Sequence, residues 1–232
     1  MIFNDLNFKL TLDLSTTVLL TALGLAILLL SLPVIRKYVA VINTMIHEAG
    51  HAVASKLTGG EVVKIDLRMN TEGTAWSRNG YLGGIIVSAA GYPAASLFAF
   101  SMLLLFKHGL ITTAAVAYLI IIVGMGILWV RNLYGIIWVT SITLSMTALF
   151  LADQYYNWDA MPYMLLVVVM IVLVQSVTSA FAIMIISFKT PRNAGDASSL
   201  ARAIKIVPPQ VFGLLFFLQS IVFLVLSVRL FI

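Results

Sequence analysis

The chain has 232 residues, of which 61% are hydrophobic and only 10% are charged, and its formal net charge is +5. Soluble domains usually contain about 25% charged residues, so this composition excludes an ordinary soluble fold and predicts a protein that resides in a lipid bilayer. The absence of cysteine excludes disulfides and thiolate metal sites. We attribute the positive charge to cytoplasmic loops and expect no nucleic-acid partner.

Apolar stretches recur along the chain at a length that suits membrane helices. A spanning helix needs about 20 predominantly apolar residues, and we therefore predict an all-α polytopic membrane protein with about six or seven transmembrane helices. The candidate spans are Ser15–Ile35, Tyr38–Leu57, Tyr81–Phe106, Leu110–Val130, Leu133–Leu151, Met161–Ser187 and Val211–Leu230. We expect a single membrane-embedded domain over residues 1–232.

The segment Gly59–Gly80 is too polar to span a membrane. Its Val62–Leu67 stretch lies between glycine-rich turns and is rich in β-branched residues, which predicts a strand or a hairpin. We therefore expect a short membrane-associated β segment directly after the second span.

The distribution of Lys and Arg predicts an orientation. With seven spans the termini lie on opposite faces, and the face of the N-terminus collects most of the basic residues. That face would carry Lys9, Lys56, Lys64, Arg68, Arg78, Arg131, Lys189, Arg192, Arg202 and Lys205, and the other would carry Arg36, Lys37, Lys107 and Arg229. Cytoplasmic loops carry an excess of basic residues, so the N-terminus, the Gly59–Gly80 segment and the Lys189–Lys205 loop are predicted to be cytoplasmic.

The second span contains the sequence His47-Glu48-Ala49-Gly50-His51, an H-E-x-x-H pattern. Residues four positions apart share one face of a helix, so both imidazoles can reach one zinc ion, with Glu48 beside them as a base toward water. The alternative is a chance match in which the histidines bond to neighbouring helices. We favour the metal interpretation because the chain has only three histidines and two of them form the motif.

A catalytic zinc commonly has three protein ligands, and the motif supplies two. Asp196 is the favoured third ligand because its loop is predicted to lie on the side nearest His51. The alternative is that Asp196 only caps the helix that begins there. Asp153 and Asp159 fall on the opposite predicted side, and Asn132 is a neutral amide that binds zinc weakly.

Several stretches resemble the site-2 protease family of intramembrane zinc metallopeptidases, in particular a compact bacterial branch. These stretches are Asn43–Ala52, Leu57–Val62, Gly73–Ala75, Ser88–Pro93, Val130–Gly135 and Gly195–Ala197. Other members carry the third ligand in an N-x-x-P-x-x-x-L-D-G pattern. Here that pattern would start at Asn132, but Gly135 replaces the proline and Thr140 stands where the aspartate would be.

The resemblance implies a metalloendopeptidase that hydrolyses peptide bonds in or near transmembrane segments of membrane protein or peptide substrates, in a bacterial-type plasma membrane. It implies Zn²⁺ as cofactor, His47, His51 and Asp196 as ligands, and Glu48 as general base. Asn132 would hydrogen-bond the developing oxyanion, unless it is only a satisfied polar residue at a helix end. The Gly60–Gly73 segment would pair with an unwound substrate by strand addition, unless it is a plain cytoplasmic hairpin.

Two other functions compete with proteolysis. One is a metal-binding, non-proteolytic membrane protein that regulates or binds membrane peptides, and the intact Glu48 argues against it. The other is a transporter, which has no need for H-E-x-x-H and for which no internal repeat is present. The sequence does not determine the oligomeric state.

Overall fold

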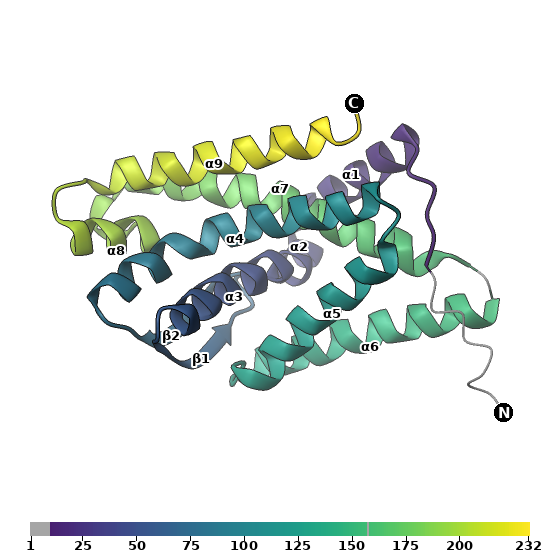
Figure 1. Cartoon of the computed structure of the whole chain (residues 1–232), viewed down its shortest axis with the longest axis horizontal. Helices are drawn as coiled ribbons and strands as arrows, with labels where there is room; N and C mark the ends of the chain where they lie inside the picture. Colours follow the sequence, from purple (N-terminus) through teal and green to yellow (C-terminus); the bar gives the residue numbers. More distant parts are fainter. Residues whose placement is uncertain (1–9, 157) are drawn as a thin grey trace.

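The computed structural model describes residues 10–156 and 158–232, and most of these residues lie in long helices that run along one axis (Figure 1). The helices before the hairpin are α1 (Thr16–Ser31), α2 (Pro33–Val39) and α3 (Val41–Leu57). The hairpin consists of β1 (Glu61–Leu67) and β2 (Gly73–Arg78). It is followed by α4 (Tyr81–Lys107), α5 (Ile111–Leu128), α6 (Leu133–Tyr156), α7 (Ala160–Lys189), the 3-10 turn η1 (Pro191–Asn193), α8 (Gly195–Ile204) and α9 (Pro209–Arg229).

The described helices confirm an all-α polytopic membrane protein with a small β segment. By length and composition, 5 of them could cross a membrane, namely α4, α5, α6, α7 and α9. The count rises to 6 if α1 and the α2–α3 pair form one broken span, with a bend of 111° between them.

The upper estimate of seven spans is not reached among the described helices, because the first two predicted spans together form at most one bent passage. α1 has 16 residues and α3 has 17, and at 1.5 Å per residue each is about 25 Å long, short of the roughly 30 Å hydrocarbon core. Pro33 occupies the first position of α2 and has no N–H to continue the hydrogen bonds of α1, so the chain turns there.

The two ends of the described chain lie together, at the far end of the bundle from the hairpin. The Leu10 N–H donates to Thr112 Oγ1 at 2.9 Å, and Lys107 Nζ lies 5.7 Å from the centre of the Phe231 ring. α4 runs from the hairpin to this end (Figure 1). Leu10, the first described residue, therefore lies at the end of the bundle opposite the hairpin, which differs from the predicted placement of both at one face; the orientation in the membrane stays a prediction.

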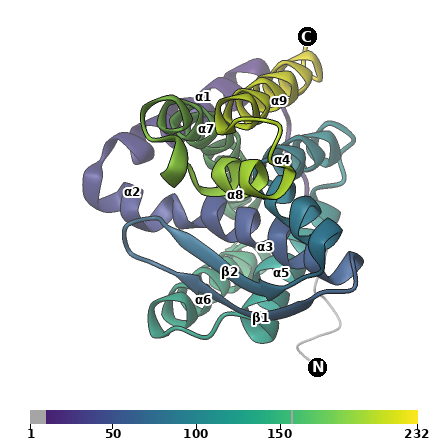
Figure 2. The ribbon, with the colours of Figure 1, turned by 90° about the vertical axis from the view of Figure 1, so that its left-hand side faces the viewer.

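The hairpin folds back along α3 instead of projecting from the bundle. Thr44 Oγ1, in the first turn of α3, donates to the Thr71 carbonyl at the hairpin tip at 2.7 Å. Figure 2 shows β1 and β2 on one side of α3 and α8 on the other. The predicted β segment is thus confirmed, and α3 is enclosed between two elements that both come from the same end of the bundle.

The outer edge of β1 is occupied by the junction between α5 and α6. The Ile65 N–H donates to the Trp129 carbonyl at 2.7 Å, and the Arg131 N–H donates to the Ile65 carbonyl at 3.3 Å. β1 and β2 pair antiparallel, with Ile65 opposite Ala75. In an antiparallel pair, the backbone N–H and C=O groups of successive residues point alternately toward and away from the partner strand. Ile65 directs its groups away from β2, so Ala75 opposite it directs its groups away from β1, toward the edge of β2 that no described strand covers.

Small residues allow α3 and α4 to pack closely behind the motif. A Cβ placed on Gly50 would overlap the Ala94 Cβ and lie 3.1 Å from the Ala90 carbonyl oxygen. This contact brings the backbone of α4 up to the imidazoles.

Candidate metal centre

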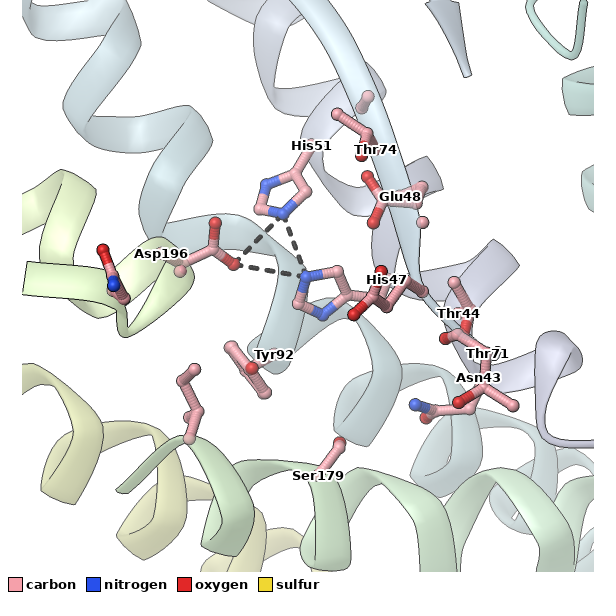
Figure 3. Close-up of a pocket in the computed structure, with 16 residues that line it drawn as sticks. Asn43, Thr44, His47, Glu48, His51, Thr71, Thr74, Tyr92, Ser179 and Asp196 are labelled. Carbon is pink, nitrogen blue, oxygen red and sulfur yellow. Dashed lines mark hydrogen bonds and ion pairs between the residues drawn. The ribbon is translucent and has the colours of Figure 1, made fainter. Parts of the chain in front are cut away.

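The H-E-x-x-H motif is helical, and its polar side chains converge on one cavity. His47 and His51 are one turn apart on α3, and their rings meet edge to face with centroids 4.7 Å apart. Figure 3 shows both imidazoles and the Glu48 carboxylate facing the same space. Local helix geometry therefore suffices to assemble three of the predicted groups.

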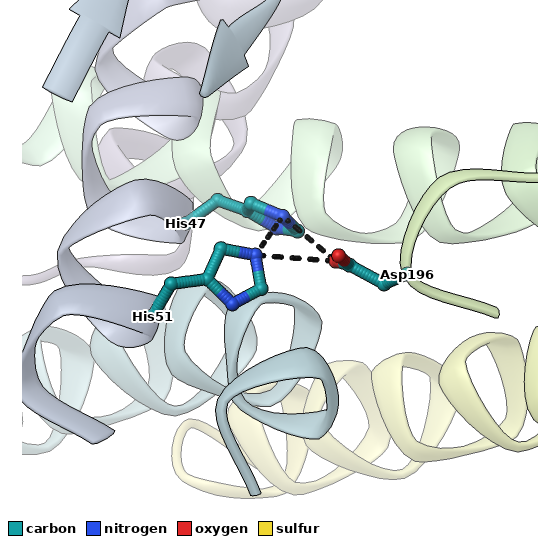
Figure 4. A group of neighbouring side chains, drawn as sticks. All are labelled: His47, His51 and Asp196. Atoms are coloured by element: carbon teal, nitrogen blue, oxygen red, sulfur yellow. Dashed lines mark hydrogen bonds and ion pairs between the residues drawn. The ribbon is translucent and has the colours of Figure 1, made fainter. Parts of the chain in front are cut away.

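Asp196 reaches this space because α8 is packed into the bundle. Ala197 and Leu200, on one face of α8, are buried against Phe216 of α9 and Ile183 of α7. At the far end of α8 the Tyr81 hydroxyl donates to the Ala203 carbonyl at 2.7 Å. The first turn of α8 is thereby held opposite α3, as Figure 4 shows.

The turn before α8 is fixed by its own polar contacts. Ser198 Oγ accepts from the Ala194 N–H at 2.7 Å and donates to the Pro191 carbonyl at 2.8 Å. The N-cap of α8 is Ala194, and Asp196 lies in the first turn of the helix and not at the cap position. The carboxylate instead faces the two histidines, so the alternative in which Asp196 serves only as a helix cap does not describe its contacts.

The three candidate ligand atoms form a nearly equilateral triangle. His47 Nε2 and His51 Nε2 are 3.0 Å apart, and each lies 3.2 Å from Asp196 Oδ2. Ligands bound to zinc at about 2.0–2.2 Å with tetrahedral angles would be about 3.3–3.6 Å from one another. The donor set and its spacing thus fit a small tetrahedral metal ion with three protein ligands, after a slight expansion of the triangle.

Each imidazole is held in an orientation that presents Nε2 to the triangle. His51 Nδ1 lies 2.6 Å from the Val87 carbonyl oxygen, which can only accept a hydrogen bond, so Nδ1 carries a proton and Nε2 is the nitrogen that faces the triangle. The His47 ring packs edge-on against Tyr92, with centroids 4.7 Å apart and an interplanar angle of 82°. Such outer contacts are typical of imidazoles that bind metal ions.

Gly91 leaves the space in which an ion would sit. A Cβ at this position would be 2.5 Å from His47 Nε2 and 2.6 Å from His51 Nε2. Any side chain larger than hydrogen would therefore occupy the volume beside both candidate ligand atoms. Gly91 therefore shapes the site.

Glu48 is 5% exposed and lies between α3 and β2. The backbone of Ala75 hydrogen-bonds its carboxylate, and a Cβ on Gly73 would come within 2.7 Å of Glu48 Oε1. The close approach of β2 thus fixes the carboxylate next to the histidines, from the side opposite α8.

The charge of Asp196 is favoured by its surroundings. Burial alone would raise the pKa of this carboxyl, but hydrogen bonds with His47 and His51 and the charges of those rings outweigh burial, so the pKa lies below its usual range. The group is therefore a carboxylate anion at neutral pH, which is the form that binds metal ions.

Two cavities meet at the candidate ligands. The larger has a volume of about 450 Å³ and is bounded by α3, the start of β2, α7 and the turn before α8. The smaller, about 320 Å³, is lined by β2, the start of α4 and Ser199 of α8. His51, Ala75 and Asp196 line both cavities, so the triangle lies where they join.

Asn132 is not brought to the site and has a different task. Its Oδ1 accepts from the Leu67 N–H at 3.0 Å, and its Nδ2 donates to the Leu67 carbonyl at 2.5 Å. Both ends of the amide are therefore used to tie β1 to the start of α6. The residues that line the larger cavity do not include Asn132, and the oxyanion role expected from the sequence is replaced by this structural one.

Asp153 is also remote from the histidines. Its Oδ1 and Oδ2 accept from the Ala160 and Met161 N–H groups at 2.8 and 2.7 Å and so cap the start of α7. This end of the bundle is the one opposite the hairpin. The sequence disfavours Asp153 as a metal ligand because it predicts this residue on the side opposite the histidines, and the observed placement agrees with that expectation.

Comparison with known families matches residues 19–227 to the Peptidase M50B-like model. No curated protein and no solved structure matches the chain. The match covers nearly the whole chain. Members of this family are metallopeptidases, which agrees with a group of His47, His51 and Asp196 that could hold a metal ion. The chain therefore belongs to the Peptidase M50B-like group of the site-2 protease family.

Proposed function

We propose that the protein is an intramembrane zinc metalloprotease that hydrolyses peptide bonds in or near transmembrane segments of other membrane proteins. The observation that carries the proposal is the triangle of two imidazoles and one carboxylate, with edges of 3.0–3.2 Å and a buried glutamate beside it. Family membership supports metallopeptidase activity in general, and the donor set of nitrogen and oxygen atoms suits zinc.

His47, His51 and Asp196 would hold the metal ion, and Glu48 would act as general base. A bound zinc ion would polarise the scissile carbonyl and lower the pKa of water. Glu48 takes the proton from the attacking water and delivers it to the leaving amine, a task for which its carboxylate is fixed by Ala75. Tyr92 and the Val87 carbonyl keep the two imidazoles in place throughout.

The edge of β2 that no described strand covers, along which Ala75 hydrogen-bonds Glu48, is the best-placed docking strip for an extended substrate. β1 is excluded because its outer edge pairs with the α5–α6 junction. β2 runs along both cavities, with Gly73 and Thr74 in the larger, Trp76 and Ser77 in the smaller, and Ala75 in both. Strand addition would thus draw an unwound substrate past the candidate ligands. The strip is β2 and not the whole Gly60–Gly73 segment.

We propose that the hairpin end of the bundle faces the cytoplasm and that the N-terminus faces the opposite side. Among the described residues, the hairpin end carries Lys56, Lys64, Arg78, Arg131, Lys189, Arg192, Arg202 and Lys205, whereas the other end carries Lys107 and Arg229; Arg36 and Lys37 on α2 and Arg68 at the hairpin tip are assigned to neither end. The excess of basic residues favours a cytoplasmic hairpin. The candidate metal centre is then reached from the cytoplasmic half of the membrane.

Single cysteines introduced into this cysteine-free chain should report the orientation. Arg78 and His108 are exposed at opposite ends of α4. An impermeant maleimide added outside intact cells should label His108→Cys and spare Arg78→Cys, and lysis should make both reactive. Labelling of Arg78→Cys in intact cells, with His108→Cys protected, would reverse the proposed orientation.

The function itself is tested with purified protein and a panel of single-span membrane peptides that carry a helix-breaking Gly-Pro pair at successive depths. We expect about one zinc per chain and chelator-sensitive cleavage of some peptides, with cut sites mapped by mass spectrometry. Zinc-loaded protein that binds the peptides without cutting any of them would contradict the protease and favour the peptide-binding alternative.

A further inference from the structure

Asn43 is a polar residue in the wall of the larger cavity, and the proposed hydrolysis assigns it no role. Asn43 lies on α3 one turn before His47 and two turns before His51, on the same face of the helix. It lines the larger cavity together with Thr44 and Ser179. Figure 3 shows its side chain extending from the α3 wall toward the α7 wall that carries Ser179.

The amide of Asn43 is buried without sufficient hydrogen bonds. The residue is only 7% exposed, and its Oδ1 has no hydrogen-bond partner in the described part of the chain. Buried polar side-chain atoms in folded proteins nearly always have a partner, and exceptions call for an explanation. A group that lines a cavity and lacks a partner is suited to bind whatever enters the cavity.

The chemistry of the side chain indicates which kind of group would satisfy it. A carboxamide offers a carbonyl acceptor and an N–H donor side by side, and a peptide group offers the complementary pair. The protein already uses this pairing elsewhere, because Asn132 binds both the N–H and the carbonyl of Leu67. Rotation about the last side-chain torsion of Asn43 is soft, so either amide atom can turn toward a ligand.

The position of Asn43 sets its distance from the reacting bond. One helical turn corresponds to about 5.4 Å, and an extended peptide advances about 3.3 Å per residue, so a turn spans about two substrate residues. Asn43 lies one turn farther than His47 from the end of the bundle at which α3 ends and α4 begins. Its neighbour Thr44 donates to the Thr71 carbonyl at the hairpin tip. The membrane-embedded side of a substrate would pass this point.

We propose that Asn43 is a substrate-binding residue that hydrogen-bonds a main-chain peptide group about two residues from the scissile bond, on the membrane-embedded side. This inference rests on the proposed protease function. Because the contact is to backbone atoms, it selects for an unwound substrate and not for particular side chains. A helical substrate keeps its peptide groups in its own hydrogen bonds and cannot satisfy Asn43.

The test measures binding of metal-directed probes, so it does not depend on turnover. Acetohydroxamate, which carries no peptide group, is compared with tripeptidyl hydroxamates extended in either chain direction, and with versions in which one peptide N–H at a time is replaced by an ester oxygen. Dissociation constants are determined by calorimetry on zinc-loaded wild type, Asn43→Leu and Gln219→Leu. Leucine has the branched shape of asparagine without its polar atoms, and it suits a membrane helix.

Gln219 provides the matched control. It is another amide with an unpartnered buried Oε1, but its Nε2 donates to the Phe216 carbonyl at 2.9 Å, and neither cavity at the metal centre includes it. Replacing it with leucine removes a buried amide of the same kind from a different place. Its probe affinities should match those of wild type.

In wild type, one ester position should weaken binding about 5-fold, the size expected for one net hydrogen bond, and the other positions should have little effect. In Asn43→Leu that position should no longer matter, and the ratio of tripeptidyl to acetohydroxamate affinity should fall about 10-fold. The ratio cancels any effect on the metal centre itself.

An Asn43→Leu protein that binds the whole series as wild type does would overturn the proposal and leave a buried water as the partner of Asn43. Failure of wild type to bind acetohydroxamate at all would overturn the metal centre, and the role of Asn43 with it. The two failures are therefore distinguishable.

Discussion

Replacement of Glu48 by glutamine should abolish peptide hydrolysis while leaving the metal content and the fold unchanged. Glutamine has nearly the shape of glutamate, so the contact with Ala75 and the tight fit against Gly73 can persist. It cannot accept a proton from water, and loss of a general base typically slows a reaction by about 10²–10⁴-fold. The membrane-peptide panel with mass-spectrometric detection measures the change.

The metal content is the control for this experiment, because it separates loss of the base from loss of the site. Elemental analysis of Glu48→Gln should give the wild-type zinc content, and thermal unfolding should be little changed. Wild-type turnover in Glu48→Gln would exclude Glu48 as the base. Loss of zinc would instead show that the carboxylate is needed to hold the imidazoles in place.

The parts of the molecule that were predictable from the sequence are those governed by local geometry. His47 and His51 are one turn apart on a helix, so their convergence follows from the 3.6-residue period alone. The β-branched run Val62–Leu67 between glycine-rich turns likewise specifies a strand. The apolar stretches after the hairpin are long enough that their length alone identifies them as spans.

The start of the chain was predicted less well because its structure depends on tertiary packing. α1 and α3 are each apolar but too short to span the bilayer alone, and hydropathy does not show that they form one bent passage. Tyr38, near the end of α2, is held by α6, because the Trp138 Nε1–H donates to the Tyr38 carbonyl at 3.0 Å. The predicted orientation depends on whether the number of spans is even or odd, so it depends on how this first passage is counted.

The surroundings of the histidines were also beyond sequence reasoning. The acceptor for His51 is the backbone carbonyl of Val87, and any residue type could supply it. Asn132 drew attention as a polar residue at a span boundary, a pattern that fits both an oxyanion donor and a strand anchor. Only its contacts with Leu67 distinguish the two. Asp196 was identified by elimination and resemblance, and its role as a ligand stays a prediction.

Replacement of Asp196 by asparagine should sharply weaken zinc binding, since a neutral amide is a poor substitute for a carboxylate ligand. Loss of an outer-shell partner commonly costs about 10–100-fold in metal affinity, and loss of a direct ligand should exceed that range. Competition with a chelator of known affinity measures the change. Peptide cleavage should fall with the zinc content and return in part at high zinc concentration.

Asp153→Asn is the matched control, because the same chemical change is made at a carboxylate that caps a helix at the other end of the bundle. The amide oxygen of asparagine can still accept one of the two N–H groups of Ala160 and Met161, so the loss of the other hydrogen bond should lower stability by about 0.5–1.5 kcal/mol and leave zinc affinity unchanged. A capping role for Asp196 predicts the same behaviour for both variants, whereas the ligand role predicts loss of zinc in Asp196→Asn alone. Because Asp196 lies inside the first turn of α8 and not at its N-cap, and because its Oδ2 is 3.2 Å from both imidazoles, we expect the second pattern. Wild-type zinc affinity in Asp196→Asn would leave a bound water or the substrate as the third group around the ion.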